Sequence, residues 1–290
     1  MKSPARMILA AGCAIGLLSA PTAAWSAEQP TSAAKPTSTP KPTATPKPTA
    51  TPAPKAKAKP VDCTKVKCIA LTFDDGPGKY ADKLLDTLKK HGAKATFFLE
   101  GQYVKSRPAF AKRMVVEGHD IGNHSYTHPK FTESPVEKIR EELQRTQDIV
   151  KKVTGRYPTT IRPPYGLLDD DTKTVATEMK MPIVLWNGGS RDWATKNEKA
   201  IYDEVLKNAK RDGVILMHDW VTQTVTVMPK LLTELKRRGY HVVAVSSLPG
   251  AKNLKPGDVY PPGAAEDKDL TSDSPTEDQN APVESPTDGG

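Results

Sequence analysis

Several patterns that identify common classes of enzyme and binding protein are absent from this 290-residue chain. There is no Gly-x-Ser-x-Gly segment, which the nucleophile elbow of a serine esterase requires. Aromatic residues make up only 6% of the chain, and the lysines of its central part are scattered rather than clustered with aromatics along one stripe. These absences disfavour a covalent serine esterase and a nucleic-acid-binding protein, so we expect no nucleic-acid partner.

Charge is missing from most of the N-terminal segment. Lys2 and Arg6 are followed by an uncharged run from Met7 to Ala27 that begins strongly apolar and ends in small residues. This order is typical of a secretory signal peptide, so residues 1–27 predict an exported protein that is secreted or associated with the cell wall. A lipoprotein-type box ending at Cys13, or an apolar run left uncleaved as a membrane anchor, is a less favoured alternative.

Apolar residues are scarce in two further stretches, neither of which can form a packed core. Residues 28–60 contain nine prolines, seven threonines and six lysines, partly in three tandem hexads from Lys35 to Pro52. We predict a disordered linker with polyproline II character. Its reach of on the order of 100 Å suits either a tether through a cell wall or a simple solubilising spacer. The C-terminal stretch 251–290 becomes strongly acidic after residue 265, and we predict a disordered tail there.

What remains, residues 61–250, is long enough for one domain with a full hydrophobic core. Short apolar runs alternate with amphipathic segments, a pattern typical of β-α units around a parallel sheet. The predicted strands are Ile69–Phe73, Ala95–Leu99, Asp120–Gly122, Thr160–Arg162, Ile183–Trp186, Val214–Met217 and Val242–Val245. The predicted helices are Tyr80–His91, Pro108–Glu117, Pro135–Val153, Asp170–Met179, Glu198–Arg211 and Val227–Arg238. About seven such units predict an α/β protein, built either as a small, incomplete barrel or as an open, doubly wound sheet.

Polar side chains follow the ends of the predicted strands. They are Asp74 and Asp75, His124 and His128, Arg162, Asp192 and Trp193, and His218. In a β/α barrel the carboxyl ends of the strands meet at one face, where active sites are built. We therefore expect this set of side chains to converge on a single site.

Two adjacent carboxylates, Asp74 and Asp75, end the first predicted strand in the segment Thr72-Phe-Asp-Asp-Gly-Pro77. Neighbouring side chains on an extended chain point to opposite sides, so one carboxylate could bind a metal while the other acts as a base. An ordinary turn built by Asp-Gly-Pro is the alternative interpretation. The pair cannot supply the facing acid and nucleophile of a glycoside hydrolase without a distant partner.

Two imidazoles, His124 and His128, are spaced four residues apart, which predicts that both lie on one side of a single helical turn. One carboxylate and two histidines form a natural set of three protein ligands that leaves a position on a divalent metal open for water. A structural pair that caps a loop is the alternative. Arg162, in a stiff Arg-Pro-Pro-Tyr-Gly loop, could fix a carboxylate through paired hydrogen bonds.

Once a leader is removed, two cysteines remain, Cys63 and Cys68. In an oxidising compartment they can form a disulfide at the start of the domain, and two free thiols are the less favoured alternative. Zinc binding by this pair would need two further ligands, which the neighbouring residues do not supply.

Five short segments stand out in order along the chain. They are Thr72-Phe-Asp-Asp-Gly-Pro77, His124-Ser-Tyr-Thr-His128, Arg162-Pro-Pro-Tyr-Gly166, Asp192-Trp193 and Leu216-Met-His218. Together they resemble the five motifs of the polysaccharide deacetylases, carbohydrate esterase family four, which share the chitooligosaccharide-deacetylase homology domain. The resemblance covers Cys68 to about Leu248. It implies a distorted, incomplete (β/α) barrel that binds a divalent metal, commonly Zn²⁺, with Co²⁺ and other divalent ions as alternatives.

The resemblance also implies a role for each residue of the set. The metal ligands would be Asp75, His124 and His128. Asp74 would be the general base and His218 the general acid. Arg162 would orient Asp74, and Asp192 would support His218. The oxyanion would be bound by the backbone N–H of Tyr165, and the pocket for the acetyl methyl group would be lined by Trp193 and Leu216.

The expected function is removal of N-acetyl groups from cell-wall polysaccharide, with peptidoglycan N-acetylglucosamine or chitin oligomers as substrates. We expect a monomer with no stable membrane span after the signal peptide is removed. O-deacetylation of xylan is an alternative, because hydrolysis of an ester uses the same water and metal. Gly189 stands where the family's fourth motif usually opens with an aspartate, so a catalytically silent polysaccharide-binding homologue is a further alternative.

Overall fold

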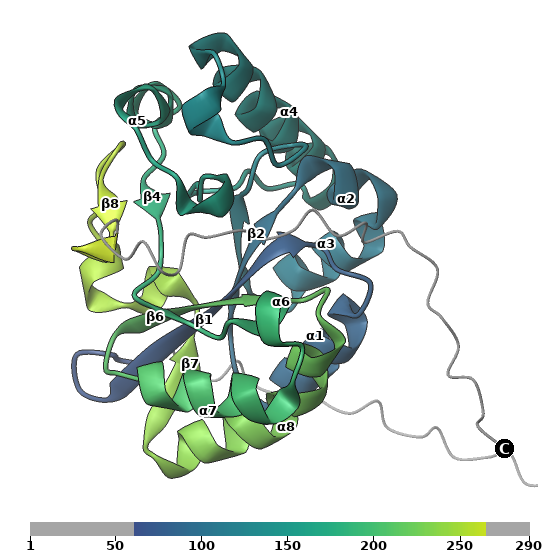
Figure 1. Ribbon diagram of the computed structural model, residues 1–290, viewed down its shortest axis with the longest axis vertical. Coiled ribbons are helices and arrows are strands. Elements are labelled where there is room, and N and C mark those ends of the chain that lie inside the picture. Colours follow the sequence, from purple (N-terminus) through teal and green to yellow (C-terminus); the bar gives the residue numbers. More distant parts are fainter. Residues whose placement is uncertain (1–60, 265–290) are drawn as a thin grey trace, which may run out of the picture. The chain divides into compact units, whose positions relative to one another are not determined.

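The computed structural model describes residues 61–264 (Figure 1). Its strands are β1 (Lys67–Gly76), β2 (Thr96–Leu99), β3 (Asp120–Asn123), β4 (Ile183–Val184), β5 (Gly188–Gly189), β6 (Gly213–His218), β7 (Tyr240–Val243) and β8 (Val259–Tyr260). Its α-helices are α1 (Ala81–His91), α2 (Gly101–Ser106), α3 (Pro108–Val116), α4 (Val136–Thr154), α5 (Asp170–Glu178), α6 (Asp192–Thr195), α7 (Glu198–Asn208) and α8 (Thr222–Arg237). The predicted signal peptide, the predicted linker and residues 265–290 of the predicted tail lie outside the described residues.

The strands pair in parallel in the order β3-β2-β1-β6-β5, and β7 also pairs with β1. β4 and β8 form a separate parallel pair, and a single residue, Ile161, bridges β3 to β4. The described strands form no closed barrel, so the prediction of an incomplete parallel (β/α) barrel is confirmed. The predicted strand Thr160–Arg162 is reduced to this one bridge, because Pro163 and Pro164 cannot donate backbone hydrogen bonds to a ladder.

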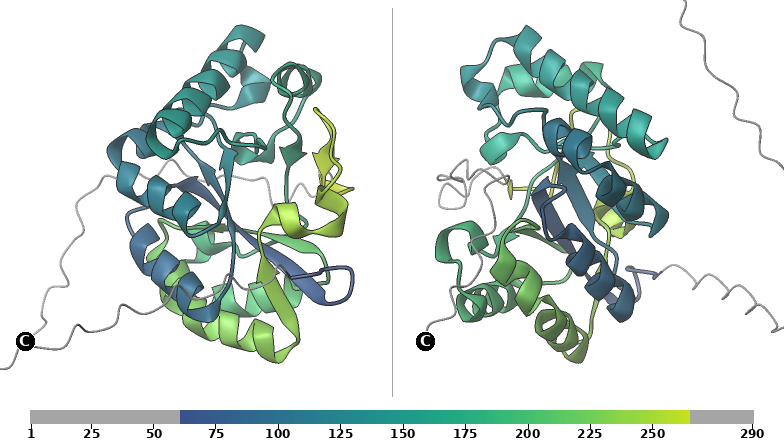
Figure 2. Two further views of the ribbon diagram at one scale, coloured as in Figure 1. Left: turned by 180° about the vertical axis from the view of Figure 1, so that it is seen from behind. Right: turned by 90° about the vertical axis from the view of Figure 1, so that its right-hand side faces the viewer.

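The side chains of β1, the central strand, alternate between two apolar clusters. Ile69, Leu71 and Phe73 pack in the cluster that includes residues of α1 and α8, whereas Ala70 packs in the cluster that includes residues of β4. Because the side-chain period of a strand is two, Asp74 lies on the same side of β1 as Ala70. Figures 1 and 2 show α1, α7 and α8 grouped on one side of the strands and α2, α3 and α4 on another. This alternation places Asp74 on the side of β1 opposite to Ile69, Leu71 and Phe73.

Most predicted helices are present, and α8 differs most from its predicted bounds. It begins at Thr222 rather than Val227, and Pro229 lies inside it. The segment before Val227 is rich in threonine and valine, which favour a strand locally, but burial of Val225 and Met228 in the core stabilises a helix. The sequence pattern does not predict α2 and α6, which are too short to show a helical period. None of the helices within residues 61–264 has both the length and the apolar character needed to cross a membrane.

The described fold continues through Ala264, whereas the sequence pattern places residues 251–264 in the tail. β8 is bound to the β4 region by backbone hydrogen bonds, including one from the N–H of Leu185 to the carbonyl of Tyr260. Tyr260 is 5% exposed and packs in the cluster that includes β4. The acidic residues that favour disorder begin only at Glu266, so the composition of the whole stretch conceals this short strand.

At the start of the domain, Cys63 and Cys68 form a disulfide, with their Cα atoms 5.5 Å apart. Both side chains are fully buried. The guanidinium of Arg211 donates hydrogen bonds to the carbonyls of Cys63 and Thr64. The disulfide and this arginine together hold the turn that leads into β1.

Candidate active site

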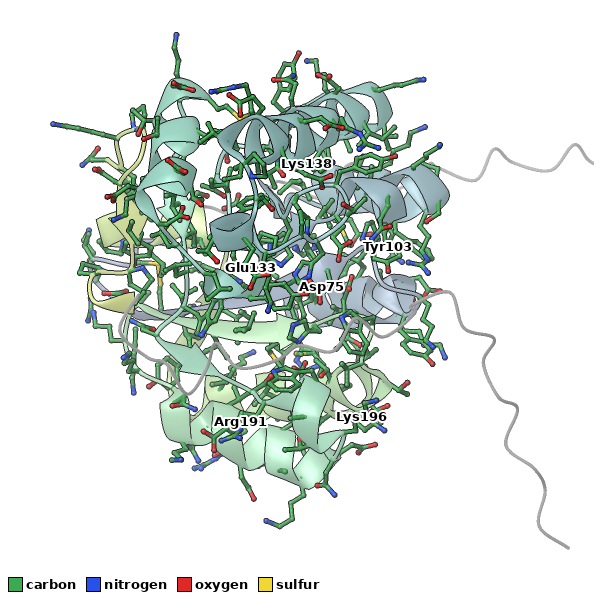
Figure 3. The ribbon with its side chains drawn as sticks, turned by 45° about the horizontal axis from the view of Figure 1, so that its top comes forward. Asp75, Tyr103, Glu133, Lys138, Arg191 and Lys196 are labelled. Carbon is green, nitrogen blue, oxygen red and sulfur yellow. A yellow bond between two sulfur atoms is a disulfide. The ribbon has the colours of Figure 1, made fainter. Side chains whose placement is uncertain are left out.

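The residues singled out in the sequence come together at the carboxyl ends of the central strands. Asp74 and Asp75 lie near the end of β1, and the pairing of β1 with β6 places Asp74 opposite His218. His124 directly follows β3. Figure 3 shows Asp75 near the middle of this face of the molecule. The backbone at Asp75 has a φ of 62°, so the chain leaves its extended path there and the second carboxylate is redirected.

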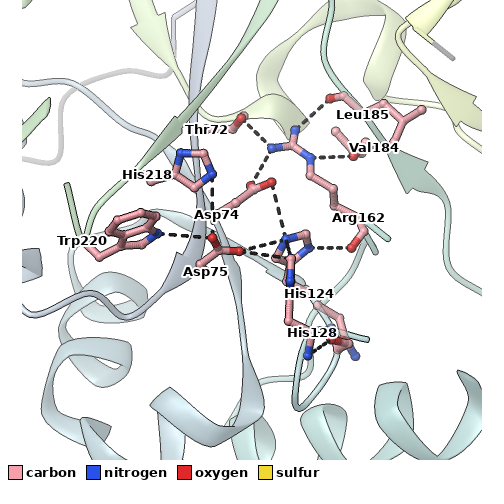
Figure 4. Close-up of polar contacts among 12 residues, drawn as sticks. Thr72, Asp74, Asp75, His124, His128, Arg162, Val184, Leu185, His218 and Trp220 are labelled. Atoms are coloured by element: carbon pink, nitrogen blue, oxygen red, sulfur yellow. Dashed lines mark hydrogen bonds and ion pairs between the residues drawn. The ribbon is translucent and has the colours of Figure 1, made fainter. Parts of the chain in front are cut away.

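Three of these side chains, Asp75, His124 and His128, form a compact group that we call the ligand cluster (Figure 4). Oδ1 of Asp75 lies 3.2 Å from Nε2 of His124 and 3.4 Å from Nε2 of His128. The two Nε2 atoms are 3.2 Å apart. Ligands bonded to a tetrahedral zinc ion at 2.0–2.1 Å are separated by about 3.3 Å, so the cluster fits a single ion of this kind.

The pKa shifts of Asp75 and His128 suit metal binding, whereas His124 differs: burial lowers its pKa, but the charges of Asp74 and Asp75 outweigh burial and hold this pKa above its ordinary value. Nδ1 of His124 lies 2.7 Å from the carbonyl oxygen of Arg162, which accepts a hydrogen bond from the Nδ1–H and leaves the Nε2 lone pair facing the cluster. Burial raises the pKa of Asp75, but the neighbouring imidazoles outweigh it and hold this pKa below its ordinary value. Burial also lowers the pKa of His128 to about 4. An ionised carboxylate and a neutral imidazole are the forms that bind divalent metals.

The two histidines lie in a loop, so the prediction of a single helical turn is wrong. The loop of residues 124–128 contains two residues with left-handed backbone, Ser125 with a φ of 67° and His128 with a φ of 60°. A left-handed residue interrupts a right-handed helix, and the imidazoles meet because the loop folds back on itself. Spacing alone cannot distinguish this loop from a helical turn, since both bring the two rings together.

Asp74 is held by a buried arginine. Nη1 of Arg162 donates a hydrogen bond of 2.6 Å to Oδ1 of Asp74, and the arginine is fully buried. Its other nitrogens donate to the carbonyls of Val184 and Leu185, and Nη1 also donates to Oγ1 of Thr72. Oδ2 of Asp74 lies 3.7 Å from Nε2 of His124. Arg162 therefore holds Oδ1 of Asp74, and Oδ2 of Asp74 faces the ligand cluster.

His218 is paired with a buried carboxylate. Nδ1 of His218 lies 2.8 Å from Oδ1 of Asp192. Oδ2 of Asp192 accepts hydrogen bonds from the backbone N–H of His218 and from the hydroxyl of Thr224. Burial alone would lower the pKa of His218, but the charge of Asp192 raises it to about 9. The imidazole is therefore protonated at neutral pH, with Nε2 3.8 Å from Oδ2 of Asp75.

Three further residues implied by the resemblance lie beside these groups. The ring of Tyr165 is centred 4.5 Å from that of His128, and its backbone has a φ of 60°. Leu216 is 8% exposed and lies two residues before His218 on β6, on the same face of the strand. Trp193 is partly buried, and its backbone N–H donates to Oδ1 of Asp192. The structure thus places all three near the paired groups of the site.

Some side chains at the site are not indicated by the sequence pattern. The indole N–H of Trp220 donates a hydrogen bond of 3.2 Å to Oδ2 of Asp75. The buried carboxylate of Asp219 accepts the N–H of Gly78, and a Cβ on Gly78 would come within 2.5 Å of Oδ1 of Asp219. Burial raises the pKa of Asp219 to about 7. In the sequence, only the position of Asp219 and Trp220 directly after the end of β6 could indicate that they belong to the site, because active-site residues gather at the ends of strands.

The fold and the site together define a parallel α/β protein. At the ends of its strands it carries three side chains that can hold one metal ion, together with a carboxylate bound by arginine and a histidine bound by aspartate. A sequence profile described as polysaccharide deacetylase matches residues 61–184. Peptidoglycan-N-acetylglucosamine deacetylase PgdA of Listeria monocytogenes serotype 1/2a is 41% identical over 187 residues, which are 64% of this chain and 40% of PgdA. The solved structure of peptidoglycan deacetylase PdaC from Bacillus subtilis is 39% identical, with a TM-score of 0.63. That match covers 66% of this chain and 94% of the PdaC structure.

The chain belongs to the polysaccharide deacetylase family, carbohydrate esterase family four. It spans less than half the length of full-length PgdA and of full-length PdaC, which is named a peptidoglycan-N-acetylmuramic acid deacetylase. The family is not uniform in activity. BA3943 from Bacillus anthracis, whose structure is described as that of a family pseudoenzyme, is 32% identical with a TM-score of 0.60. That match covers 63% of this chain and 65% of BA3943.

Proposed function

We propose that this protein is a secreted, metal-dependent hydrolase that removes N-acetyl groups from cell-wall polysaccharide. Peptidoglycan is the first substrate class and chitin oligomers are the second. The names of PgdA and PdaC support the choice of peptidoglycan. Export rests on the predicted signal peptide of residues 1–27, and retention at the wall rests on the predicted linker of residues 28–60.

The ligand cluster would hold the divalent cation, with Zn²⁺ as the expected ion. A cation bound there polarises the acetyl carbonyl and lowers the pKa of water from 15.7 to about 7. Neighbouring residues hold two of the ligands through atoms that do not face the metal position. Trp220 holds the second oxygen of Asp75, and the carbonyl of Arg162 orients the ring of His124.

Asp74 is the proposed general base. Arg162 holds one oxygen of this carboxylate, so the other oxygen keeps a fixed direction toward the ligand cluster. From that position Asp74 can take a proton from a water that attacks the acetyl carbon. The role of the Arg162 guanidinium is to position Asp74, because its other hydrogen bonds go to Thr72 and to the carbonyls of Val184 and Leu185.

His218 is the proposed general acid. An amide is cleaved only if the departing nitrogen gains a proton, and the imidazolium of His218 can supply it at neutral pH, since its pKa is raised to about 9. Asp192 supports that charge and sets the ring orientation. The backbone N–H of Tyr165 would stabilise the oxyanion, and Trp193 and Leu216 would line the pocket for the acetyl methyl group.

The observation that carries this proposal is the joint placement of a three-ligand cluster, a carboxylate held by arginine and an imidazolium held by aspartate in one site. The test measures acetate released by the full chain from peptidoglycan, chitin oligomers and acetylated xylan, with and without a chelator. We expect release from peptidoglycan or chitin oligomers that stops with the chelator and returns with Zn²⁺. Release from xylan alone would assign an O-acetyl esterase instead.

A silent polysaccharide-binding homologue is the second candidate, and Gly189 is the observation that favours it. Gly189 belongs to β5 and pairs with Leu216 of β6, so the backbone of this motif is kept while the side chain of the usual aspartate is missing. Binding of peptidoglycan without acetate release from any of the three substrates would favour this candidate. A Gly189→Asp variant that then gained activity would identify the missing carboxylate as the cause.

A further inference from the structure

The loop of residues 124–128 carries two of the three ligands, and the backbone N–H groups from Ser125 to His128 are all bonded by side chains. The N–H of Ser125 donates to Oδ1 of Asn123, and the N–H of His128 donates to Oγ of Ser125. The N–H groups of Tyr126 and Thr127 both donate to one oxygen, Oε2 of Glu142, at 2.9 and 2.7 Å. Every N–H from Ser125 to His128 therefore has a partner in a side chain.

Glu142 differs from the other acceptors, Asn123 and Ser125, in coming from a segment that is distant in sequence. It lies on α4, is fully buried, and follows Thr127 by 15 positions and Tyr126 by 16 positions in the chain. Its second oxygen, Oε1, accepts the hydroxyl of Thr127 at 3.0 Å and lies 3.0 Å from Nζ of Lys138. One carboxylate thus makes three hydrogen bonds to the two residues that lie just before His128.

These contacts hold a loop whose backbone is unusual. The loop has left-handed backbone at Ser125 and His128, a conformation that most side chains disfavour and that persists only where surrounding contacts enforce it. The carbonyls of Ser125 and Tyr126 accept N–H groups from the start of α2. The loop is therefore held from α2 through its carbonyls and from α4 through its N–H groups.

We propose that Glu142 is a positioning residue for the metal site, acting through the backbone N–H groups of Tyr126 and Thr127. Without an acceptor at this place, two partly buried N–H groups lose their partners and the loop relaxes to satisfy them. His124 and His128 then no longer meet at the 3.2 Å separation that suits one ion. The inference rests on the proposed function, because it assumes that the ligand cluster binds a metal.

The test measures metal affinity directly and needs no substrate. The full chain is freed of metal and titrated with Zn²⁺ against a chromophoric chelator, and the absorption spectrum of the Co²⁺ form reports the ligand geometry. Glu142→Leu removes the acceptor, and we expect an increase of roughly 10- to 100-fold in the dissociation constant for Zn²⁺, with a changed Co²⁺ spectrum. Glu141→Gln on the exposed side of α4 is the matched control, with expected values equal to wild type.

Two conservative variants separate geometry from charge. Glu142→Gln keeps a carbonyl oxygen that can accept both N–H groups, so we expect affinity within about threefold of wild type although the charge is gone. Glu142→Asp keeps the charge but withdraws the oxygens by one methylene, so we expect at least about fivefold weaker binding. The Asp variant also carries the test if Glu142→Leu fails to fold, because it retains a carboxylate in the core.

The outcomes are distinct. Wild-type affinity and spectrum in Glu142→Leu, or in Glu142→Asp if the Leu variant is unfolded, would overturn the inference. Weak binding by Glu142→Gln together with normal binding by Glu142→Asp would also overturn it, since the charge and not the hydrogen bonds would then matter. A wild-type chain that binds neither Zn²⁺ nor Co²⁺ would instead refute the proposed function.

Discussion

Asp192 contacts His218 at two points, through Oδ1 to the ring Nδ1 and through Oδ2 to the backbone N–H, each at 2.8 Å. This double contact fixes both the charge and the orientation of the imidazole. It keeps Nε2 as the only ring nitrogen that can deliver a proton toward the ligand cluster. The first prediction therefore concerns the pH range in which this proton is available.

We predict that kcat/KM falls at high pH as His218 loses its proton, with an apparent pKa in the wild type above the ordinary value of a histidine, because Asp192 raises it. Asp192→Asn removes the charge that raises the pKa of His218, so this alkaline limb should move down by at least about one pH unit. Rates of acetate release between pH 5 and 10 measure it. Asp170→Asn, at an exposed position of α5, should leave the profile unchanged. An unshifted limb in Asp192→Asn would exclude His218 as the acid.

We predict that Asp74→Asn lowers kcat by about 10²- to 10⁴-fold, the contribution typical of a positioned acid or base. The amide oxygen can still accept the hydrogen bond from Arg162, so the variant should fold and bind Zn²⁺ like wild type. Acetate release and metal affinity are measured on the same preparation. Near-normal turnover in this variant would remove Asp74 from the mechanism.

We predict that metal removal lowers the melting temperature, because an ion that binds only the folded state stabilises it by about 2.7 kcal/mol at one hundred times its dissociation constant. Thermal unfolding is compared with saturating Zn²⁺ and with a chelator. His128→Ala should abolish the difference between the two conditions, since it removes one of the three ligands. Equal melting temperatures of the wild type in both conditions would argue against a bound metal.

We predict that Gly78→Ala destabilises the domain by about 1–3 kcal/mol, the usual cost of overpacking. The added Cβ would come within 2.6 Å of the backbone of Asp219 and Trp220, which must then shift. Because Trp220 donates to Asp75, metal affinity should fall as well. Gly155→Ala is the control. Its φ of 77° costs stability by about 1 kcal/mol, but no atom lies nearby, so metal affinity should not change.

We predict that a buried histidine remote from the cluster limits stability at mild acid pH. Nδ1 of His119 accepts the N–H of Ala95, Nε2 has no partner among the described residues, and burial lowers the pKa to about 4. The unfolded chain takes up this proton below about pH 6.5 and the folded chain does not. Stability is therefore lost as pH falls from about 6.5 to 4, by up to about 3 kcal/mol.

The measurement is urea unfolding of the wild type and of His119→Gln at pH 7 and pH 5. A neutral glutamine can accept the same N–H and does not titrate. The variant should lose less stability between the two pH values than the wild type. An equal loss in both proteins would show that other groups set the acid sensitivity.

The parts of the fold that could be predicted from sequence are those that local patterns determine. Alternation along β1 predicts that the side chains of Asp74 and Asp75 point to opposite sides of the strand, and the turn residues that follow mark the strand end. The positions of His124 and His218 at strand ends follow from the same reasoning. These residues needed no knowledge of distant contacts, since the parallel order of strands brings their ends together.

The remaining features depend on contacts between segments far apart in sequence. In the sequence, Glu142 is one of several acidic residues on an amphipathic helix. Nothing in the neighbouring residues predicts that it is buried against the loop of residues 124–128. β8 is only two residues long and exists because β4 supplies a partner. The spacing of four between His124 and His128 predicts a helical turn, and it cannot identify the loop because both conformations bring the two rings together.

Arg162 has a consequence for how relatives of this chain can diverge. Its guanidinium joins the carbonyls of Val184 and Leu185, on the unclosed side of the strands, to the inward face of β1. A descendant that lost turnover would still need this cation to keep its architecture, so the arginine should survive after selection on chemistry ends. Comparisons of sequences that aim to separate active from inactive relatives should therefore examine the residue at position 74 and not Arg162, which contacts it.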